Sequence, residues 1–506
     1  MDGHTQAVSR IAQQVAQFAL QKKPFRIYHG STNSTRPSER RQDNTIDTSQ
    51  LTKILNVDKD RKIALCEPNV PMDRLVQETL KYNLVPLVVM EFPGITVGGG
   101  FSGTSGESSS FRYGAFDSII NSIEIVLANG TIERASKVDK KDLFWGAASA
   151  FGTIGVVTLL EIELREATPF VALTYSLAKG AEETVKLIQE ECEKPKVDYI
   201  DGIAFSPELT VICSGTMADE VPSGQQARTF TRPSDPWFYL RAEEVIKELT
   251  KNPKLPVVDY IPITDYLFRY DRGGFWTGKA AFEYFAAPYN RYTRRILDRY
   301  MHARVMYHAG HKSGMTDRAI VQDVGIPYDR AVEFQNWLDD KFNIYPLWLC
   351  PLRVQRNDPE ACHGLHAQFA FPNAPGLLNY GVWGRFQGTA RENMEKNRVL
   401  EAKVQEFKGK KWLYSHAYYT EDEFWAHYDK ESYDKLREKY SATHLKSVFD
   451  KVAIDFEAQE AAATATPWKR FKHTIGEIWP VRGLYGVYKA TTGGDYLLQK
   501  KSSATK

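Results

Sequence analysis

Residues 92–110 read FPGITVGGGFSGTSGESSS, and this stretch decides how the rest of the chain is interpreted. It contains six glycines and is rich in serine and threonine. Glycine permits positive φ angles and lets a ligand approach the backbone closely. Successive backbone N–H groups can then form a concave site for phosphate oxygens, with hydroxyl groups as further donors. The stretch therefore predicts a loop that binds a phosphate-bearing ligand.

Two common phosphate-binding motifs do not describe this stretch. The pattern GxxxxGK[ST] is absent. Gly98, Gly100 and Gly103 fit GxGxxG, but no long helix with a ribose-binding acid follows them. Taken alone, the glycines are also compatible with a plain flexible loop, so their context has to decide.

Two further landmarks flank the glycine-rich stretch. Upstream, an apolar strand at 25–28 leads into the polar loop 30–36, GSTNSTR. Downstream, residues 152–158, GTIGVVT, lead into the strand segment LLEIEL. Periodicity between them predicts an alternation of short elements. The predicted strands are 63–67, 85–89, 119–127, 131–135 and 156–164, and the predicted helices are 73–82 and 143–150.

These three landmarks, in this order and at this spacing, resemble the FAD-binding domain of the vanillyl-alcohol-oxidase and p-cresol-methylhydroxylase (PCMH) superfamily. The resemblance implies an α+β fold, with a PCMH-type FAD-binding domain of two α/β subdomains and a mixed α/β substrate, or cap, domain. It also implies that the first two loops surround the FAD diphosphate and that GxxGVVT lies along the flavin. The implied FAD contacts are Gly30, Ser31, Thr32, Asn33, Ser34, Thr96, Val97, Gly98, Gly99, Gly100, Ser102, Gly103, Thr104, Ser105, Gly106, Glu107, Ser108, Ser109, Ser110, Arg112, Tyr113, Gly114, Gly152, Ile154, Gly155 and Val157.

A narrower resemblance covers about residues 24–455. The strings GESSSFRYG (106–114) and IYPLWLCP (344–351) are similar to those of the sterol Δ24-reductase (Diminuto) family. Members of that family open with a hydrophobic membrane segment and match nothing in 468–506. The resemblance implies that NADPH reduces FAD, and that the Δ24 C=C bond in the side chain of a sterol or related isoprenoid is then reduced. Two alternatives stay open: an FAD-dependent oxidase or dehydrogenase of an alcohol or lactone, and a non-catalytic binding protein.

Four residues in or beside the phosphate loops need separate interpretations. Many relatives attach FAD covalently through a histidine, and Ser31 occupies that position here, so we expect noncovalent FAD. His29 lies one or two residues too early to replace it. Arg112 is equally compatible with a phosphate contact and with a structural ion pair. For Glu107 we expect a structural role.

The identity of a proton donor is not fixed by the sequence. Weak candidates from the cap and its return segment are Tyr380, Tyr414, His416 and Tyr418. Gln322 and Asp323 are interpreted as polar loop groups near the flavin. Tyr345, Trp348 and Cys350 fall on an apolar strand, where we expect core packing with one face toward the substrate.

The protein is expected to divide at residues 168, 400 and 458. An FAD-binding domain with an N-terminal helix would span 1–168, the cap 169–400, and a helical return segment 401–458. Residues 459–506 would form a low-complexity linker (459–467) and a basic tail. The amphipathic helix at 8–21 has two interpretations, packing on the body or lying on a membrane surface.

Composition excludes several classes of protein. The 506 residues carry a net charge of +2, which gives no reason to expect a nucleic-acid partner. Five scattered cysteines predict neither a disulfide framework nor a metal site. No signal peptide and no apolar run long enough to span a bilayer is found. We expect an apolar, sterol-like small-molecule substrate. The protein itself is expected to be cytoplasmic or to contact the endoplasmic reticulum membrane peripherally. The sequence does not determine its oligomeric state.

Overall fold

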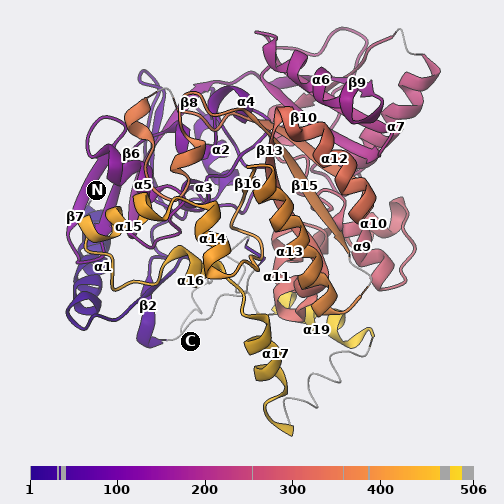
Figure 1. Ribbon diagram of the computed structural model, residues 1–506. Helices are drawn as coiled ribbons and strands as arrows, with labels where there is room; N and C mark the ends of the chain where they lie inside the picture. The colour runs from indigo at the N-terminus through magenta and orange to yellow at the C-terminus, as the bar shows by residue number, and fades with distance from the viewer. Residues whose placement is uncertain are drawn as a thin grey trace, which may run out of the picture.

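Two β-sheets lie side by side in the computed structural model, which describes residues 2–30, 34–35, 42–252, 255–356, 358–385, 388–467 and 479–492 (Figure 1). The N-terminal third of the protein forms the first sheet, and most of the remainder forms the second. Helices cover the outer surfaces of both sheets. The mixture of helix and mainly antiparallel sheet confirms the expected α+β fold.

The first sheet has the strand order β3-β4-β8-β6-β7, with β5 also paired to β8. Its long central strand β8 alternates buried and less buried residues along most of its length, as a strand with one face in the core should. The expected turn at Asn129 and Gly130 connects β6 to β7, and Gly130 has a φ of +90°. The strand bounds are β3 Ile54–Asp58, β4 Ile63–Cys66, β5 Leu84–Pro86, β6 Ile120–Leu127, β7 Ile132–Ser136 and β8 Gly155–Glu166; a separate parallel pair is formed by β1 Arg26–Tyr28 and β2 Thr45–Asp47.

The second sheet contains eight strands in the order β12-β9-β11-β10-β14-β15-β13-β16. Its bounds are β9 Phe170–Ala178, β10 Tyr199–Ser206, β11 Leu209–Ala218, β12 Val257–Pro262, β13 Ala319–Pro327, β14 Leu347–Leu352, β15 Leu377–Arg385 and β16 Lys410–Lys411. One face packs on helices α6 (Gly180–Glu193), α12 (Tyr328–Phe342) and α13 (Ala390–Glu406) to form a separate core. The other face turns toward the first sheet and shares its core.

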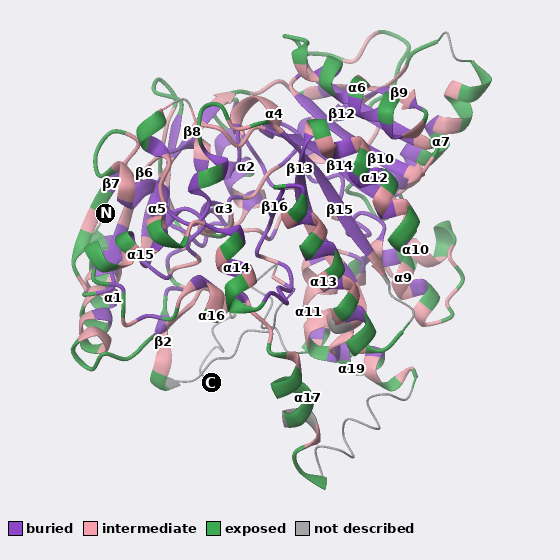
Figure 2. Cartoon of the chain, viewed as in Figure 1, coloured by how far each residue is buried: buried purple, intermediate pink, exposed green. Residues whose placement is uncertain are grey.

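The remaining helices complete the two halves, and Figure 2 shows their outer faces exposed over a buried interior. They are α1 Asp2–Leu20, α2 Met72–Leu80, α3 Val97–Gly103, α4 Ser110–Tyr113, α5 Lys141–Ala147, α7 Phe238–Lys251, α8 Ile263–Leu267, α9 Thr277–Tyr284, α10 Arg291–Ile296, α11 Ala303–Ser313, α14 Glu421–His427, α15 Lys430–Lys439, α16 Val448–Val452, α17 Phe456–Thr464 and α19 Val481–Thr492. Short 3₁₀ turns occur at Gln42–Asn44, Phe116–Ile119, Asp298–Tyr300, Met315–Arg318, Pro359–Ala361 and Ala367–Phe369.

The secondary structure of the C-terminal part differs from the expected pattern at two places. The expected linker at 459–467 is mostly the helix α17, because Asp455 caps its first turn at Ala458 N and the alanine-rich run has high helix propensity. The return segment 401–458 is not purely helical either, since it supplies strand β16 to the edge of the second sheet. Two residues are too few to give a periodic signal in the sequence.

Helix α1 packs on the first sheet, which favours the first of its two interpretations. It buries Val8, Ile11 and Val15. His4 fixes its first turn, since the two ring nitrogens lie 2.9 Å from a Glu67 carboxylate oxygen and 3.1 Å from one of Glu124. These two bonds, Glu124 first, raise the pKa of His4 to about 9. The imidazolium form is therefore the one that the fold stabilises.

Replacing His4 by Gln should loosen α1 in a pH-dependent way. Because the pKa of His4 is raised on folding, its contribution is complete below about pH 6.5 and is lost as the pH rises through about 9. Its size corresponds to on the order of 3 kcal/mol. Tryptic cleavage at Arg10 should accelerate in His4→Gln at pH 7, and the difference from the wild type should shrink above pH 9.

The matched control is Gln13→Ala, which changes an exposed position of the same helix. This variant should be cleaved at the wild-type rate at both pH values. Equal cleavage of His4→Gln and the wild type at pH 7 would contradict the role of His4.

Candidate functional site

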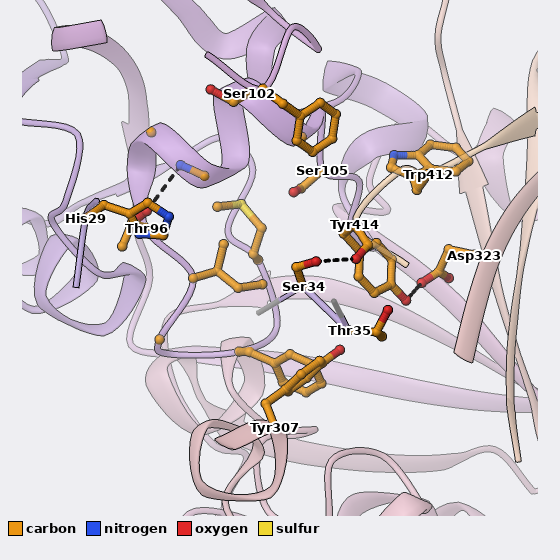
Figure 3. Close-up of a pocket in the computed structure, with 18 of the residues that line it drawn as sticks. His29, Ser34, Thr35, Thr96, Ser102, Ser105, Tyr307, Asp323, Trp412 and Tyr414 are labelled. Carbon is orange, nitrogen blue, oxygen red and sulfur yellow. Dashed lines mark hydrogen bonds between the residues drawn. The ribbon is translucent and has the colours of Figure 1, made fainter. Parts of the chain in front are cut away.

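A cavity of about 530 Å³ lies between the two sheets. Both halves of the protein line it, and Figure 3 shows polar side chains of the N-terminal half facing Tyr307, Asp323, Trp412 and Tyr414 across it. The cavity is within the size range of ligand sites in proteins. Its polar lining includes His29, Ser34, Thr35, Thr48, Asn69, Thr96, Ser102, Ser105, Asp323, Asn379 and Tyr414.

The glycine-rich stretch lies on this cavity, but its conformation differs from the predicted one. Residues Val97–Gly103 form the helix α3, whose N-cap Thr96 accepts a hydrogen bond from Gly99 N at 3.1 Å. Gly98 N donates to Pro68 O at 2.7 Å. No glycine of residues 92–110 has a positive φ, because the threonine cap lets the segment form a right-handed helical turn. The N–H groups of the first turn are thus already bonded within the protein.

Glycine is needed in this stretch for close packing. A Cβ on Gly98 would lie 2.7 Å from Pro68 Cβ, and one on Gly100 would lie 2.4 Å from Met90 Cε. Gly103 differs, because a Cβ there would meet nothing nearer than Ser105 Oγ at 3.7 Å. Gly103 lines the cavity, so a larger residue at this position would occupy ligand space rather than protein space.

The GxxGVVT segment belongs to the N-terminal half, like the glycine helix, and also borders the cavity. Gly152, Ile154, Gly155 and Val157 all line the cavity. Gly152 has a φ of +73°, which disfavours any larger residue. A Cβ on Gly155 would lie 2.5 Å from Val126 O on the neighbouring strand β6. Here the glycines do bring the backbone to the cavity wall, as the sequence indicates.

The first polar loop is described only in part. The implied FAD contacts Ser31, Thr32 and Asn33 lie outside the described residues. Ser34 and Thr35 line the cavity, where Ser34 Oγ donates to Tyr414 O at 2.8 Å and Thr35 N donates to the same oxygen at 3.1 Å. Thr35 Oγ1 is buried and has no hydrogen-bond partner among the described residues. The two bonds to Tyr414 O hold this part of the loop at the cavity wall.

The expected FAD contacts separate into two groups. Those on the cavity are Ser34, Thr96, Gly98, Gly99, Ser102, Gly103, Ser105, Gly106, Gly152, Ile154, Gly155 and Val157. Outside its lining lie Gly30, Val97, Gly100, Thr104, Glu107, Ser108, Ser109, Ser110, Arg112, Tyr113 and Gly114.

The outer group has structural partners. Arg112 donates to the backbone oxygens of Lys194 and Val197 at the end of α6, which differs from both the phosphate contact and the ion pair considered for it. Ser109 Oγ donates to Leu87 O, and Glu107 N donates to Ser110 Oγ. The serine run thus closes a turn beneath the cavity.

The second sheet contributes an aromatic wall. Phe275 and Trp383 lie with ring centroids 4.3 Å apart, and Trp348 stacks on Trp383 at 5.8 Å. Tyr307 on helix α11 and Trp412 complete this wall. Trp348 therefore occupies the cavity-facing side of the IYPLWLCP strand, while Leu347 and Leu349 on the other face pack in the core of the second sheet. Such a wall suits an apolar ligand.

Two polar side chains interrupt the aromatic wall. Tyr414 Oη donates to Asp323 Oδ2 at 2.5 Å, and Asn379 Nδ2 donates to Asp323 Oδ1 at 2.8 Å (Figure 3). Burial raises the pKa of Asp323 to about 6 even though both bonds favour its ionised form. Burial and the neighbouring carboxylate raise the pKa of Tyr414 well above the usual value, so its hydroxyl stays protonated. The pair can hold and pass a proton.

Strand alternation decides which other candidates reach the cavity. Asp323 and Asn379 point to the cavity face of β13 and β15, so their neighbours Gln322 and Tyr380 point to the opposite face. Tyr380 Oη donates to Ala331 O on α12. Gln322 is bonded to Asn397 and Ser415, and it is a strand residue rather than the expected loop residue.

His416 and Tyr418 stack on each other in the interior, with ring centroids 5.9 Å apart, and do not line the cavity. Of the four proton-donor candidates, only Tyr414 lines it.

Four ionisable residues of the cavity were not predicted from the sequence: Arg26, Glu91, Tyr307 and Lys451. Glu91 ends the apolar run before Pro93, and burial together with repulsion from Glu107 raises its pKa well above the usual value. Burial also raises the pKa of Glu107, which lies behind the lining, to about 7. The sequence does contain a signal for Glu91, because a carboxylate directly between an apolar run and a glycine-rich stretch indicates a buried, functional position.

The residues present fit a dinucleotide flavin. The hydroxyls of Ser102 and Ser105 provide donors near the glycine helix, and Thr35, whose hydroxyl has no partner among the described residues, lies beside Tyr414. Because Gly152 and Gly155 have no side chains, a ligand can approach the backbone at the start of β8 closely. Among the described residues no group of His, Cys, Asp and Glu could hold a metal ion.

Comparison with known proteins agrees with this geometry. Residues 4–136 match the family model described as an FAD binding domain. The protein is 27% identical over 424 residues to the Delta(24)-sterol reductase of Homo sapiens, an alignment that spans 79% of this sequence and 76% of that protein. It is 26% identical over 421 residues to the Delta(24)-sterol reductase of Arabidopsis thaliana, spanning 78% and 74%. It is also 33% identical over 135 residues to cytokinin dehydrogenase 9 of Oryza sativa, spanning 26% of this sequence and 25% of that protein.

Gly103→Val should remove bound flavin without disturbing the fold. The protein has room for the valine, whereas a ligand in the cavity would collide with it. We expect at least a roughly tenfold loss of FAD per mole of purified protein. FAD is measured in the supernatant after acid precipitation, where noncovalent attachment leaves a colourless pellet.

Gly3→Val is the control, because Gly3 is a helical glycine remote from the cavity whose Cβ would have comparable room, 3.6 Å from Lys53 Nζ. This variant should retain wild-type flavin. If Gly103→Val also retains full flavin, the glycine helix does not border the cofactor. A yellow pellet would contradict noncovalent attachment.

Proposed function

We propose that this protein, an FAD-dependent oxidoreductase similar to the Delta(24)-sterol reductases, reduces a C=C bond in the side chain of a sterol or related isoprenoid with electrons from NADPH. The observation that carries this proposal is the Asp323–Tyr414 pair set in an aromatic wall of the cavity. An apolar substrate has an apolar surface to bind there, with a single polar site at which a proton can be delivered.

The wall favours an alkene over a sugar-like substrate. A hydroxyl-rich substrate would need several polar side chains fixed around it. On the second-sheet side the cavity instead offers Phe275, Tyr307, Trp348, Trp383 and Trp412, with polar groups concentrated at Asp323, Asn379 and Tyr414. An isoprenoid group can pack along these rings and place its double bond beside Tyr414.

Reduction of an unactivated alkene requires two deliveries, a hydride to one carbon and a proton to the other. When bound, FAD reduced by NADPH supplies the hydride. The Tyr414 hydroxyl is placed to give its proton to the second carbon, and Asp323 in its protonated form replaces that proton through the 2.5 Å hydrogen bond. The aromatic wall excludes water, which would otherwise add to the carbon on which positive charge develops. NADPH, the alkene and one proton yield NADP⁺ and the saturated product.

The direction of the reaction can be tested on the purified yellow protein. Under anaerobic conditions NADPH should bleach the flavin absorbance, and a sterol or isoprenoid that carries a C=C bond in its side chain should restore it. Oxygen should restore it more slowly. If an alcohol or lactone bleaches the flavin, oxygen restores the colour rapidly and no alkene does, the protein is an oxidase or dehydrogenase and the proposal fails.

The Asp323–Tyr414 pair can be tested by removing either proton-bearing group. Tyr414→Phe and Asp323→Asn should keep bound FAD and its bleaching by NADPH, but slow alkene-dependent reoxidation by roughly 100-fold or more. In the wild type this reoxidation should slow as the pH rises above about 6, because ionisation of Asp323 removes the proton that it supplies. In Asp323→Asn that pH dependence should disappear.

Tyr380→Phe is the matched control, because the Tyr380 hydroxyl bonds to Ala331 O on the face of β15 away from the cavity. It should reoxidise at close to the wild-type rate. A wild-type rate in Tyr414→Phe, or equal slowing in Tyr380→Phe, would show that the proton comes from elsewhere.

A further inference from the structure

Helix α19 in the C-terminal tail (468–506) is packed with its small residues inward and its large apolar residues outward. Gly483, Gly486 and Ala490 are buried. Val481, Leu484, Tyr485 and Tyr488 follow one another at positions i, i+3, i+4 and i+7, and they are 41–59% exposed. Amphipathic helices on the surface of soluble globular proteins show the opposite arrangement, with the apolar stripe facing the protein core. Trp479, just before the helix, is 58% exposed and extends the stripe.

The inward face of α19 is closely fitted, so its orientation is fixed by packing. A Cβ on Gly486 would lie 2.6 Å from Ala309 O on α11, and one on Gly483 would lie 2.3 Å from a ring carbon of Tyr284 at the end of α9. Trp479 Nε1 donates to Tyr284 O at 2.5 Å. Rotating the helix to bury Leu484 and Tyr488 would therefore force larger side chains into these contacts. The exposed stripe is a consequence of this fit.

The charge of the tail indicates what covers the stripe. Residues 468–506 carry eight Lys or Arg residues against two acidic ones, Glu477 and Asp495. Within the helix the charged residues are Arg482 and Lys489, both basic. Tyrosine and tryptophan beside basic residues, on a helix with one apolar face, are typical of elements that lie in the interface of an anionic bilayer.

The stripe is separated from the cavity by a single helix. Figure 1 shows α19 alongside α11, and Figure 2 shows exposed residues along its outer side. Helix α11 contacts α19 through Ala309 and Ser313, and it presents Met306 and Tyr307 to the cavity on another side. A bilayer on α19 would therefore lie one helix diameter from the aromatic wall.

We propose that α19 forms a docking surface for an anionic lipid bilayer. The apolar stripe inserts into the bilayer near the headgroups, while the basic residues Arg482 and Lys489 of the same helix attract the negative surface. This arrangement holds the protein peripherally, which is consistent with the described residues containing no helix long and apolar enough to cross a membrane. It places the cavity close to a reservoir of apolar substrate, although the docking itself does not depend on the reaction proposed above.

Co-sedimentation of the full-length holoprotein with vesicles tests this surface. The wild type should bind vesicles of phosphatidylcholine with phosphatidylserine more strongly than vesicles of phosphatidylcholine alone. Leu484→Ser/Tyr488→Ser should reduce binding to the mixed vesicles roughly tenfold or more, since two inserted side chains are lost. Its FAD content and thermal unfolding midpoint should equal those of the wild type, because both side chains are exposed.

The control variant Ile132→Ser/Val138→Ser removes two exposed apolar side chains from β7 and the turn after it, which are 44% and 84% exposed. It should bind vesicles like the wild type. Equal vesicle binding by both double variants, or none by the wild type, would overturn the proposal. So would a wild-type dimer, seen by light scattering without vesicles, that is lost in Leu484→Ser/Tyr488→Ser, because the stripe would then pair with a second copy. These measurements need no alkene, so they are independent of the proposed reaction.

Discussion

Hydrogen bonds from the short segment 410–414 join the two halves of the molecule, and the cavity depends on them. The backbone oxygen of Tyr414 accepts bonds from Ser34 and Thr35 of the first polar loop. The indole of Trp412 donates to Thr104 O at 2.8 Å, at the end of the glycine helix. Strand β16 of the same segment pairs with β13, which carries Asp323. One short segment thus sets the distance between the flavin-binding loops and the aromatic wall.

The buried surroundings of this segment explain why it can hold that position. Lys411 is fully buried and forms an ion pair with Glu401 of α13, and its ammonium group also donates to His416 O at 2.6 Å. Removing one partner of such a buried pair would leave an uncompensated charge, which is strongly destabilising. The same segment carries Tyr414, so the residue that anchors the first polar loop through its backbone also presents its hydroxyl to Asp323 at the cavity. Structural support and the proposed proton delivery are therefore coupled.

Much of the first sheet was predictable because its signals are local. The alternation in 156–164, the Asn129-Gly130 turn and the apolar face of 73–82 each depend on neighbouring residues only, and the corresponding β8, hairpin and α2 are present. The glycine helix was not predictable as such, because the same glycines permit a loop and a helix, and the choice depends on the Thr96 cap and on packing against Pro68 and Met90. Helix α17 was not predictable for a related reason. The low complexity of 459–467 indicates a linker, whereas its alanines favour a helix, and the sequence alone does not decide between them.

The site was harder to predict than the fold, because it is assembled by long-range pairing. Four tyrosine and histidine candidates in 380–418 looked equivalent in the sequence. The pairing of β15 with β13 excludes Tyr380 from the cavity, because it turns Asn379 toward the cavity and the next residue, Tyr380, away from it. Tyr414 reaches Asp323 only because β16 returns to the edge of that sheet. Glu91 and Tyr307 join the cavity from segments more than 200 residues apart.

The central claim is that one cavity between the two sheets brings a flavin and the Asp323–Tyr414 pair together. A crystal structure of the purified yellow protein tests this claim most directly. We expect flavin density inside the cavity, with its ring between the backbone of 152–157 and the Asp323–Tyr414 pair. Flavin density outside this cavity, or a ring separated from Tyr414 by the aromatic wall, would contradict it.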